Sequence, residues 1–454
     1  MSAPVPRIAA PRGPLERLLR PFADVREGEG RRLLLLTLNA FLILAAYYVM
    51  KPVREVLILV QPGGAELKSY AYGAQALLLF AVVPLYGALA TRLPRRRLIN
   101  MVTGFFIACL PAFQALAHAQ APVAIPFFLW IGVFSLMVIA QFWAYANDVH
   151  TTEQGERLFA VIAFGSSSGA VFGAWLAGRL IRTVGVDPLL PLAAVILLLS
   201  LLVFNAIDRR ERAAAAPRAD GAVTRVADVA IGRGNAFALV ARSRYLLLMA
   251  AVIFLLNWVN SAGEYILSAV VKRAADAEVL RGALPDGAQG RYIGAFFADY
   301  FQLVNVAGMA LQLLLVSRLV RWLGVPLALC VLPVVAFGSY ATAALLPSLA
   351  VVRWMKTVEN SIDYSLMNTV RQMLFLPTSR EEKYKAKQVI DSVVVRTGDV
   401  LSALTVYVGT TAFAFGVVEF AWINVGLVVV WLGLSVLTGR EFARRTAALG
   451  PHGG

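Results

Sequence analysis

The sequence has little cysteine, histidine or charge. Its 454 residues include two cysteines and three histidines. Cys109 and Cys330 lie in apolar segments, and no spacing of cysteines and histidines matches a metal site, so neither a disulfide framework nor a metal centre is expected. Charged residues make up 15% of the chain, against about 25% in soluble domains. This composition leaves no room for a soluble catalytic domain.

Long apolar runs fill most of the chain instead. The sequence is 59% hydrophobic and its mean hydropathy is +0.70. Runs of about 20 apolar residues predict membrane-spanning helices, and the period-2 alternation of strands is absent. Twelve spans are predicted, at 33–50, 70–90, 98–118, 122–146, 158–181, 188–207, 245–270, 293–319, 324–346, 349–376, 391–415 and 417–437. The predicted fold is an all-α polytopic membrane protein, in which spans ten and eleven have the weakest hydropathy because they contain charges.

The net charge of +15 is distributed unevenly along the chain. About 29 of the 42 lysines and arginines lie in the two tails and in the even-numbered connections, as the positive-inside rule describes. Examples are the runs 95–97 and 383–387. This distribution predicts that both termini lie in the cytoplasm, and the expected location is a bacterial inner membrane. It does not indicate a nucleic-acid partner, and the lipid bilayer is the expected surrounding.

The longest hydrophilic connection, 208–244, divides the predicted spans into two groups of six. Transporters built from structural repeats share this layout. We therefore expect a cytoplasmic tail at 1–32, six-helix halves at 33–207 and 245–437, a cytoplasmic linker between them, and a cytoplasmic tail at 438–454. The first tail has no apolar core, so no cleavable signal peptide is expected.

The tenth predicted span carries a polar face. At 100° per residue, Lys356, Glu359, Asn360, Asp363 and Arg371 fall within an arc of roughly 120°. A charge at bilayer depth costs about 2.5–3.5 kcal/mol on insertion scales, so this face is not expected to contact lipid. It is expected to line a solute pathway or to meet partner charges on other helices.

Two other spans contain ionisable groups. Lys51 and Arg54 lie one turn apart near the end of the first span, and Glu55 follows Lys51 by four residues, so these charges can share a face. They either contact an anionic solute or form salt-bridged, snorkelling groups at the interface. Glu264, in the seventh span, is a candidate proton carrier or cation partner, with a structural ion pair as the alternative.

The eleventh span adds an arginine between two aspartates. Arg396 can pair with Asp399, three residues later, or can complement Glu359 or Asp363 of the tenth span. Candidate coupling or gating residues are the acids near span ends and inside polar spans. These are Glu55, Asp148, Asp299, Asp391 and Asp399.

Three glycines recur every fourth residue in the fifth span. Gly165, Gly169 and Gly173 form the small-residue pattern that lets helices pack closely. A phosphate-binding loop is the alternative, but no Gly-x-x-x-x-Gly-Lys-[Ser/Thr] motif occurs in the sequence. Helix packing is therefore the expected role.

The connection 87–97 resembles the loop between spans two and three of the major facilitator superfamily, G-x-L-A-D-R-x-G-R-[RK]-[RK]. Thr91 replaces the acidic residue and Pro94 the second glycine. A basic loop that only sets topology is the alternative explanation.

Three further patches resemble the nucleotide transporter family of plastids and intracellular bacteria, the ATP/ADP translocase type. The third patch follows that family's K-Y-S-L…I-P-L…K-x-K-x-x-x-D…R pattern, and Glu264 stands where the family has a glutamate in span seven. The matching patches are Tyr48–Leu59, Phe142–Asn147, and the series Asp363–Leu366, Leu376-Pro377, Lys385–Asp391 and Arg396.

The resemblance implies a major-facilitator-like secondary transporter that exchanges nucleotides, ATP and ADP among them, or another phosphorylated anion. Its expected path residues are Lys51, Arg54, Glu264, Lys356, Glu359, Asp363 and Arg396. The sequence departs from the family at two places: Phe128-Leu129-Trp130 replaces a Glu-Leu-Trp, and Asp363 replaces a lysine.

These departures favour an alternative, a proton-coupled facilitator for a non-nucleotide solute. A membrane enzyme or a non-transporting partner subunit are two further alternatives. The sequence offers no nucleophile–base arrangement, so no catalytic residue and no cofactor are expected.

Overall fold

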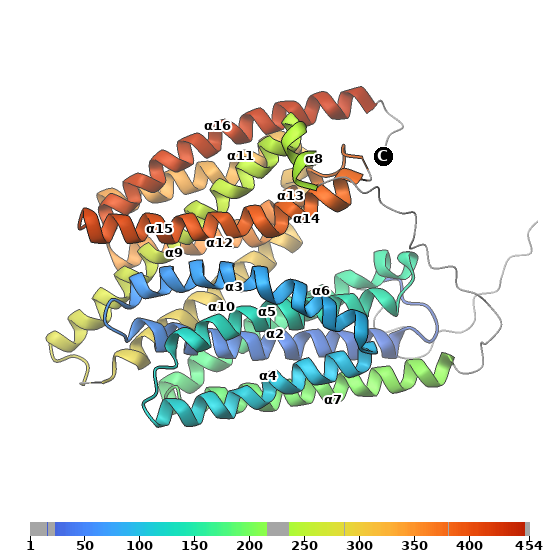
Figure 1. The fold of residues 1–454 in the computed structure, drawn as a ribbon, viewed down its shortest axis with the longest axis horizontal. Helices are drawn as coiled ribbons and strands as arrows, with labels where there is room; N and C mark the ends of the chain where they lie inside the picture. Colours follow the sequence, from blue (N-terminus) through green and yellow to red (C-terminus); the bar gives the residue numbers. More distant parts are fainter. Residues whose placement is uncertain (1–15, 17–22, 216–235, 286, 380, 450–454) are drawn as a thin grey trace, which may run out of the picture.

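The computed structural model describes residues 16, 23–215, 236–285, 287–379 and 381–449. The predicted tails and linker therefore lie partly outside the described residues. Within the described ranges the chain is helical and contains no strand, which confirms the all-α prediction. Figure 1 shows the helices running roughly parallel in two groups, one above the other.

The first group of helices forms the N-terminal half. These helices are α2 (Gly30–Leu59), α3 (Gly64–Arg92), α4 (Arg95–His118), α5 (Ala124–Asp148), α6 (Thr152–Val184) and α7 (Leu189–Ala215). α6 begins with an N-terminal cap, in which Thr151 and Gln154 form a capping box. The half has its own hydrophobic core, to which α2, α4, α5, α6 and α7 all contribute.

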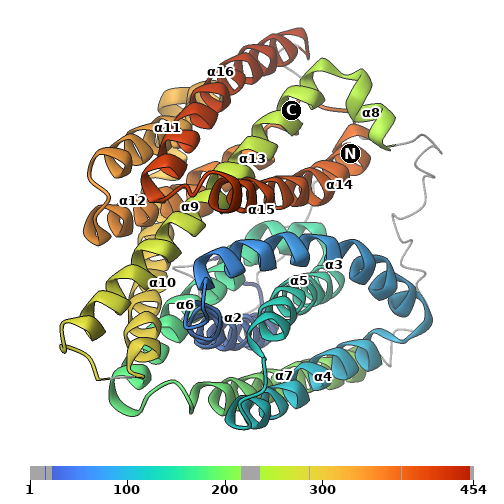
Figure 2. The ribbon, with the colours of Figure 1, turned by 60° about the vertical axis from the view of Figure 1, so that its left-hand side comes forward.

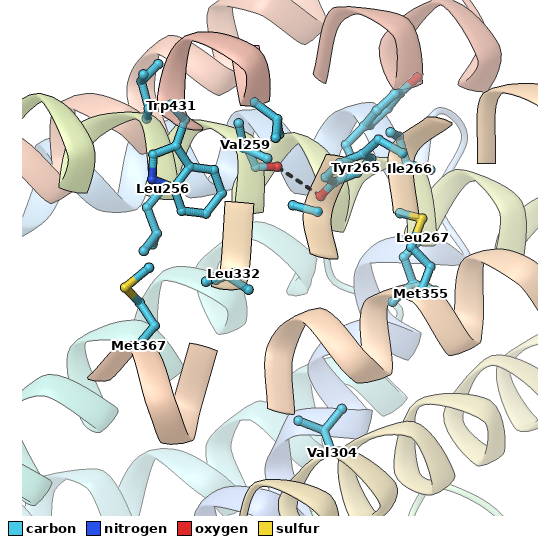
Figure 3. Close-up of a cluster of buried hydrophobic side chains, with 14 of the residues drawn as sticks. Leu256, Val259, Tyr265, Ile266, Leu267, Val304, Leu332, Met355, Met367 and Trp431 are labelled. Atoms are coloured by element: carbon cyan, nitrogen blue, oxygen red, sulfur yellow. Dashed lines mark hydrogen bonds between the residues drawn. The ribbon is translucent and has the colours of Figure 1, made fainter. Parts of the chain in front are cut away.

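The second group forms the C-terminal half. Its long helices are α9 (Arg244–Leu280), α10 (Gln289–Leu314), α11 (Val316–Leu345), α12 (Leu349–Ile362), α15 (Val395–Ala412) and α16 (Val417–Leu449). Its short elements are α8 (Ala236–Arg242), η1 (Asp363–Met367), α13 (Asn368–Met373), η2 (Glu382–Ala386), α14 (Lys387–Val389) and η3 (Ile390–Val394). Figure 3 shows part of its core, where Leu256, Leu332, Met367 and Trp431 converge from different helices.

Ten described helices are long and apolar enough to cross a membrane. The two predicted spans outside this set, the tenth and eleventh, are those predicted to have the weakest hydropathy. In the structure both are helical but interrupted by π-helical turns, η1 in the tenth and η3 at the start of the eleventh. π-Helical turns occur often at functional sites because they redirect side chains that an unbroken α-helix would place elsewhere.

Several predicted span boundaries differ from the helix ends, and two of the differences bear on the site. The second span was predicted from residue 70, but α3 begins at Gly64 because Gly63 adopts a left-handed φ of 60° that turns the chain sharply after α2. The eighth span was predicted to reach residue 319, but α10 ends at Leu314. The stretch from Val316 to the kink at Gly324 instead leads into the main part of α11.

The glycines of α6 pack against α2. A Cβ at Gly165 would lie 2.5 Å from the Thr37 side chain, and one at Gly169 or Gly173 would collide with a carbonyl oxygen of α2. Only glycine lets the two backbones approach so closely. The predicted packing role is therefore confirmed.

The main contacts between the two halves are four helix pairs. α10 of the C-terminal half packs against α2 and α6, and α3 of the N-terminal half packs against α9 and α15. Figure 2 shows α3 beside α15 at this junction. The junction includes the end of the molecule where α2 turns into α3.

A candidate solute-binding cavity

A polar cavity of about 260 Å³ lies where the two halves meet. Every one of α2, α3, α5, α9, α10, α12 and α15 contributes to its wall. Its charged and amide lining residues are Lys51, Arg54, Gln75, Asn257, Asn260, Glu264, Asn360, Arg396 and Asp399. This lining combines convergent polar groups from several helices, as small-molecule sites do.

A wider cavity of about 610 Å³ adjoins the polar one. The two share Tyr47, Lys51 and Tyr364 in their walls, so they lie side by side. Asp363 and Arg371 line the wider part only. The combined volume falls within the range of about 300–1,000 Å³ that is typical of small-molecule sites.

Lys51 is the cation shared by both cavities. It is 8% exposed, and its Nζ lies 4.2 Å from the ring centroid of Phe301 and 4.8 Å from that of Tyr48. Among the described residues it has no ion-pair partner within 4.0 Å. The cation is therefore held against aromatic faces and free to bind an anion. Lys51 and Glu55, four residues apart in α2, form no ion pair with each other, because Glu55 pairs with Arg54 and Lys68.

Glu55 is fully buried between two cations. Arg54 and Glu55 form an ion pair, with Nε of Arg54 donating to Oε1 at 3.0 Å. Nζ of Lys68 lies 2.7 Å from the other carboxylate oxygen. Arg54 also lies over the ring of Phe128, 4.8 Å from its centroid. Phe128 occupies the position at which the nucleotide transporter family has a carboxylate. Here it contacts Arg54 through a cation–π interaction instead.

Lys68 connects the two halves. From α3 it donates to Oγ of Ser268 at 2.9 Å and lies 3.6 Å from Oε2 of Glu264, both on α9. Its side chain is 1% exposed. One buried cation therefore holds a carboxylate from each half.

Glu264 also lies next to a second buried ion pair, formed by Lys356 and Glu359. Oε1 of Glu264 accepts a hydrogen bond from Asn360 at 3.1 Å and lies 3.9 Å from Nζ of Lys356. Lys356 pairs with Glu359 at 3.2 Å and donates to Asn260 at 2.9 Å. Lys356 and Glu359 do not line the cavity; they lie behind its wall, between α9, α10 and α11. The tenth-span polar face therefore meets partner charges at these two residues and the cavity at Asp363.

Arg396 pairs with Asp399 on its own helix. The distance from Nη1 to Oδ2 is 3.2 Å, and Oγ of Ser261 donates to the other oxygen of Asp399 at 2.7 Å. The structure thus selects the first of the two predicted pairings, and Arg396 does not contact Glu359 or Asp363.

Asp363 differs from the other acids of the site. It is the first residue of η1 and borders the wider cavity. In the described part of the chain its carboxylate has no hydrogen bond and no ion pair within 4.0 Å. This carboxylate is therefore available to a ligand or a proton.

Three predicted gating acids line neither of the two cavities. Asp148 at the end of α5 forms an ion pair with Arg95 of the basic loop. Asp391 pairs with Arg371 at 3.2 Å. Asp299 pairs with Arg182 at 2.9 Å, and this pair joins α10 to α6 across the two halves.

Lys68 was not predicted from the sequence as a residue of the site. Its predicted span began at residue 70, which left Lys68 in a loop. The usable signal was Gly63-Gly64, because a helix that starts after this turn places Lys68 one turn inside α3.

Comparison with known proteins identifies the fold. No protein-family model and no curated protein matches the chain. A bacterial homologue of the human lysosomal transporter Spinster, in an inward-facing and unoccupied conformation, shares 13% identity over 91% of this chain and 97% of its own, with a TM-score of 0.58. The nucleoside transporter NupG shares 11% identity over 91% and 98% of the two chains, with a TM-score of 0.60.

A third similar structure is the human organic anion transporter MFSD10. It shares 16% identity over 90% of this chain and 100% of its own, with a TM-score of 0.55. At these identities the likeness concerns the fold. The chain therefore has a major-facilitator-type transporter fold.

Proposed function

We propose that this protein is a secondary transporter that works by alternating access and carries a small organic solute with an anionic group. The observation that carries the proposal is Lys51, a buried cation on the wall of a cavity shared by both halves, with no ion-pair partner among the described residues. A charge in this position is costly unless it serves a solute or an ion. Arg54, on the same wall, can supply a second contact to the anion.

The arrangement of contacts between the halves supports alternating access. Inter-half contacts occur at the α2–α3 turn, where Lys272 donates to the Leu59 carbonyl at 3.0 Å, and at the Arg182–Asp299 pair. At the other end, the Arg95–Asp148 and Arg371–Asp391 pairs each stay within one half. On the predicted topology, with both termini in the cytoplasm of a bacterial inner membrane, this is an inward-facing state.

The family resemblance makes nucleotides the first candidate solutes. Tyr47, Tyr48 and Phe301 surround Lys51 and offer ring faces to a base beside a cation for phosphate. Exchange of one nucleotide for another would follow from the resemblance. The polar pathway proposed for it is Lys51, Arg54 and Glu264, with Lys356 and Glu359 acting from behind the wall.

Asp363 favours a second candidate, a proton-coupled transporter of a non-nucleotide solute. Its carboxylate borders the cavity and has no cationic partner within the described ranges, so it would repel a polyanionic phosphate chain. The same carboxylate could take up and release a proton as the cavity changes sides.

Transport by reconstituted protein tests the proposal. Liposomes preloaded with nucleotides, sugar phosphates or amino acids are assayed for counter-exchange and for uptake driven by a pH gradient. Lys51→Gln is expected to weaken solute affinity about 10- to 100-fold, the effect of losing one charge-assisted hydrogen bond. Lys383→Gln, an exposed lysine outside both cavities, is the matched control.

Three outcomes separate the candidates. Counter-exchange of nucleotides without dependence on a pH gradient supports the first. Gradient-driven uptake of another solute, with no nucleotide effect, supports the second. Absence of transport for every solute class, or transport unaffected by Lys51→Gln, contradicts the proposal.

A further inference from the structure

Two charges that lack ion-pair partners border the same cavity from opposite halves. Lys51 belongs to α2 of the N-terminal half and Asp363 to η1 of the C-terminal half, and both line the wider cavity of about 610 Å³. No ion pair within 4.0 Å joins them, and neither has another such partner among the described residues. The cavity therefore has a positive wall and a negative wall.

The surrounding charges are all paired. Arg54 with Glu55, Lys356 with Glu359, Arg396 with Asp399 and Arg371 with Asp391 form four ion pairs around the two cavities. Lys68 holds a further carboxylate, Glu264, at 3.6 Å. Since paired charges are largely neutralised for a ligand nearby, Lys51 and Asp363 set the charge pattern that a solute meets.

We propose that the transported solute is a zwitterion, with its acidic group on Lys51 and its basic group on Asp363. The proposal rests on the transporter function proposed above and names the solute class of that same site. A solute with both groups neutralises both walls at once and leaves no charge unpaired at membrane depth. A solute with only an acidic group leaves Asp363 uncompensated and adds repulsion to it.

The aromatic lining of the cavity indicates which zwitterions would fit. Tyr47, Tyr48 and Tyr364 border the same wider cavity. Aromatic walls favour a solute whose body is apolar or aromatic. An amino acid or a short peptide with an aromatic side chain combines this body with the required pair of charges.

Matched probes test the charge requirement directly. The twenty amino acids and a set of dipeptides are screened by thermal shift of the purified protein and by uptake into liposomes. Each active compound is then compared with its N-acetyl form, which lacks the basic group, and its methyl ester, which lacks the acidic group. The zwitterion is expected to bind at least about 10-fold more tightly than either derivative.

A carboxylate-to-amide change separates this proposal from the transporter function. Asp363→Asn is expected to lower affinity for the zwitterion about 10-fold or more while raising affinity for its N-acetyl form. Asp187→Asn, an exposed aspartate in the α6–α7 connection, should change neither.

Each outcome bears on one claim. The inference is supported if only zwitterions are transported and if Asp363→Asn shifts the preference from the zwitterion toward its N-acetyl form. If nucleotides or other simple anions are transported, and if this transport depends on Lys51 but not on Asp363, the proposal of a zwitterionic solute is wrong. The proposed transporter function is then still supported. A proton-carrier role alone is shown if Asp363→Asn abolishes gradient-driven uptake but leaves the affinities of the three probe forms unchanged, and this also overturns the inference.

Discussion

At the scale of single residues, Lys68 is a buried cation that compensates two carboxylates. Its ammonium group lies 2.7 Å from Glu55 and 3.6 Å from Glu264, and its side chain is 1% exposed. Removing one partner of a buried ion pair leaves the other charge without compensation, which costs more than the pair itself contributes. Two carboxylates, one in each half, depend on this one cation.

Replacing Lys68 is therefore expected to destabilise the protein strongly. Lys68→Met should lower the free energy of unfolding by about 3–5 kcal/mol, the range for breaking a buried pair. Thermal unfolding in detergent measures the change. Lys68→Arg keeps the charge and should lose less, and the double variant Lys68→Met/Glu264→Gln should recover part of the loss. Equal stability of Lys68→Met and the unaltered protein would show that the bridge contributes nothing.

At the scale of elements, the contact of α2 with α6 depends on glycine. Gly169 lies against the carbonyl of Phe41, where a side chain has no space. Glycine is used here for close approach of two backbones and not for flexibility.

Adding a side chain to this contact should push the helices apart. Gly169→Ala is expected to cost about 1–3 kcal/mol by overpacking. Gly433→Ala in α16 is the control, because a Cβ there meets nothing within 4 Å. Unfolding midpoints of the two variants, measured side by side, provide the comparison; an equal effect on both would contradict the packing role of Gly169.

A charged contact outside the membrane fixes the start of α2 to α6. Glu29 accepts hydrogen bonds from Arg157 at 3.1 Å and from Gln154 at 2.9 Å. Burial raises the pKa of Glu29, but the hydrogen bonds from Arg157, the Arg26 backbone and Gln154 outweigh it and lower the pKa below its usual 4.5.

This contact should lose its contribution in acid. A lowered pKa in the folded state means that the stabilisation is complete above the ordinary carboxyl pKa and disappears as the pH falls through the lower folded value. Glu29→Gln should therefore unfold at a lower temperature than the unaltered protein at pH 7, and the difference should shrink below about pH 4. A difference that stays constant with pH would contradict the role of the charge.

At the scale of the whole molecule, the two halves are joined on the side where α6 packs against α10. Gly178 of α6 faces Ala298 of α10 on the joined side, and a Cβ at Gly178 would lie 3.2 Å from that of Ala298. This spacing is close to that of a disulfide. The neighbouring Arg182–Asp299 pair joins the same two helices.

A reversible crosslink at this point should stop transport. In a background without Cys109 and Cys330, Gly178→Cys/Ala298→Cys is expected to lose uptake on oxidation and regain it with reductant, because alternating access requires this contact to open. Gly104→Cys/Ala298→Cys is the control, since Gly104 lies on α4, outside the contact between the halves. Undiminished uptake with the crosslink formed would contradict the proposed motion.

Much of the site could be predicted because buried charges stand out in apolar helices. The sequence identified Lys51, Arg54, Glu264, Asp363 and Arg396, all of which line the cavities. It missed Lys68 because hydropathy marks the apolar part of a helix and not its first turn. It also placed Lys356 and Glu359 on the cavity wall, since a helical wheel cannot distinguish a face that meets a cavity from one that meets other helices.

The sequence by itself determined the helices, their membrane setting and the presence of polar groups inside them, because these depend on run length and local periodicity. The pairing of charges was decided only by tertiary structure. Glu55 pairs with Arg54 and Lys68 rather than Lys51, and Arg396 with Asp399 rather than Asp363. Helix register and rotation arise from packing between distant segments, and they place Lys51 and Asp363 on one cavity, where neither has an ion-pair partner in the part of the chain that the structure describes.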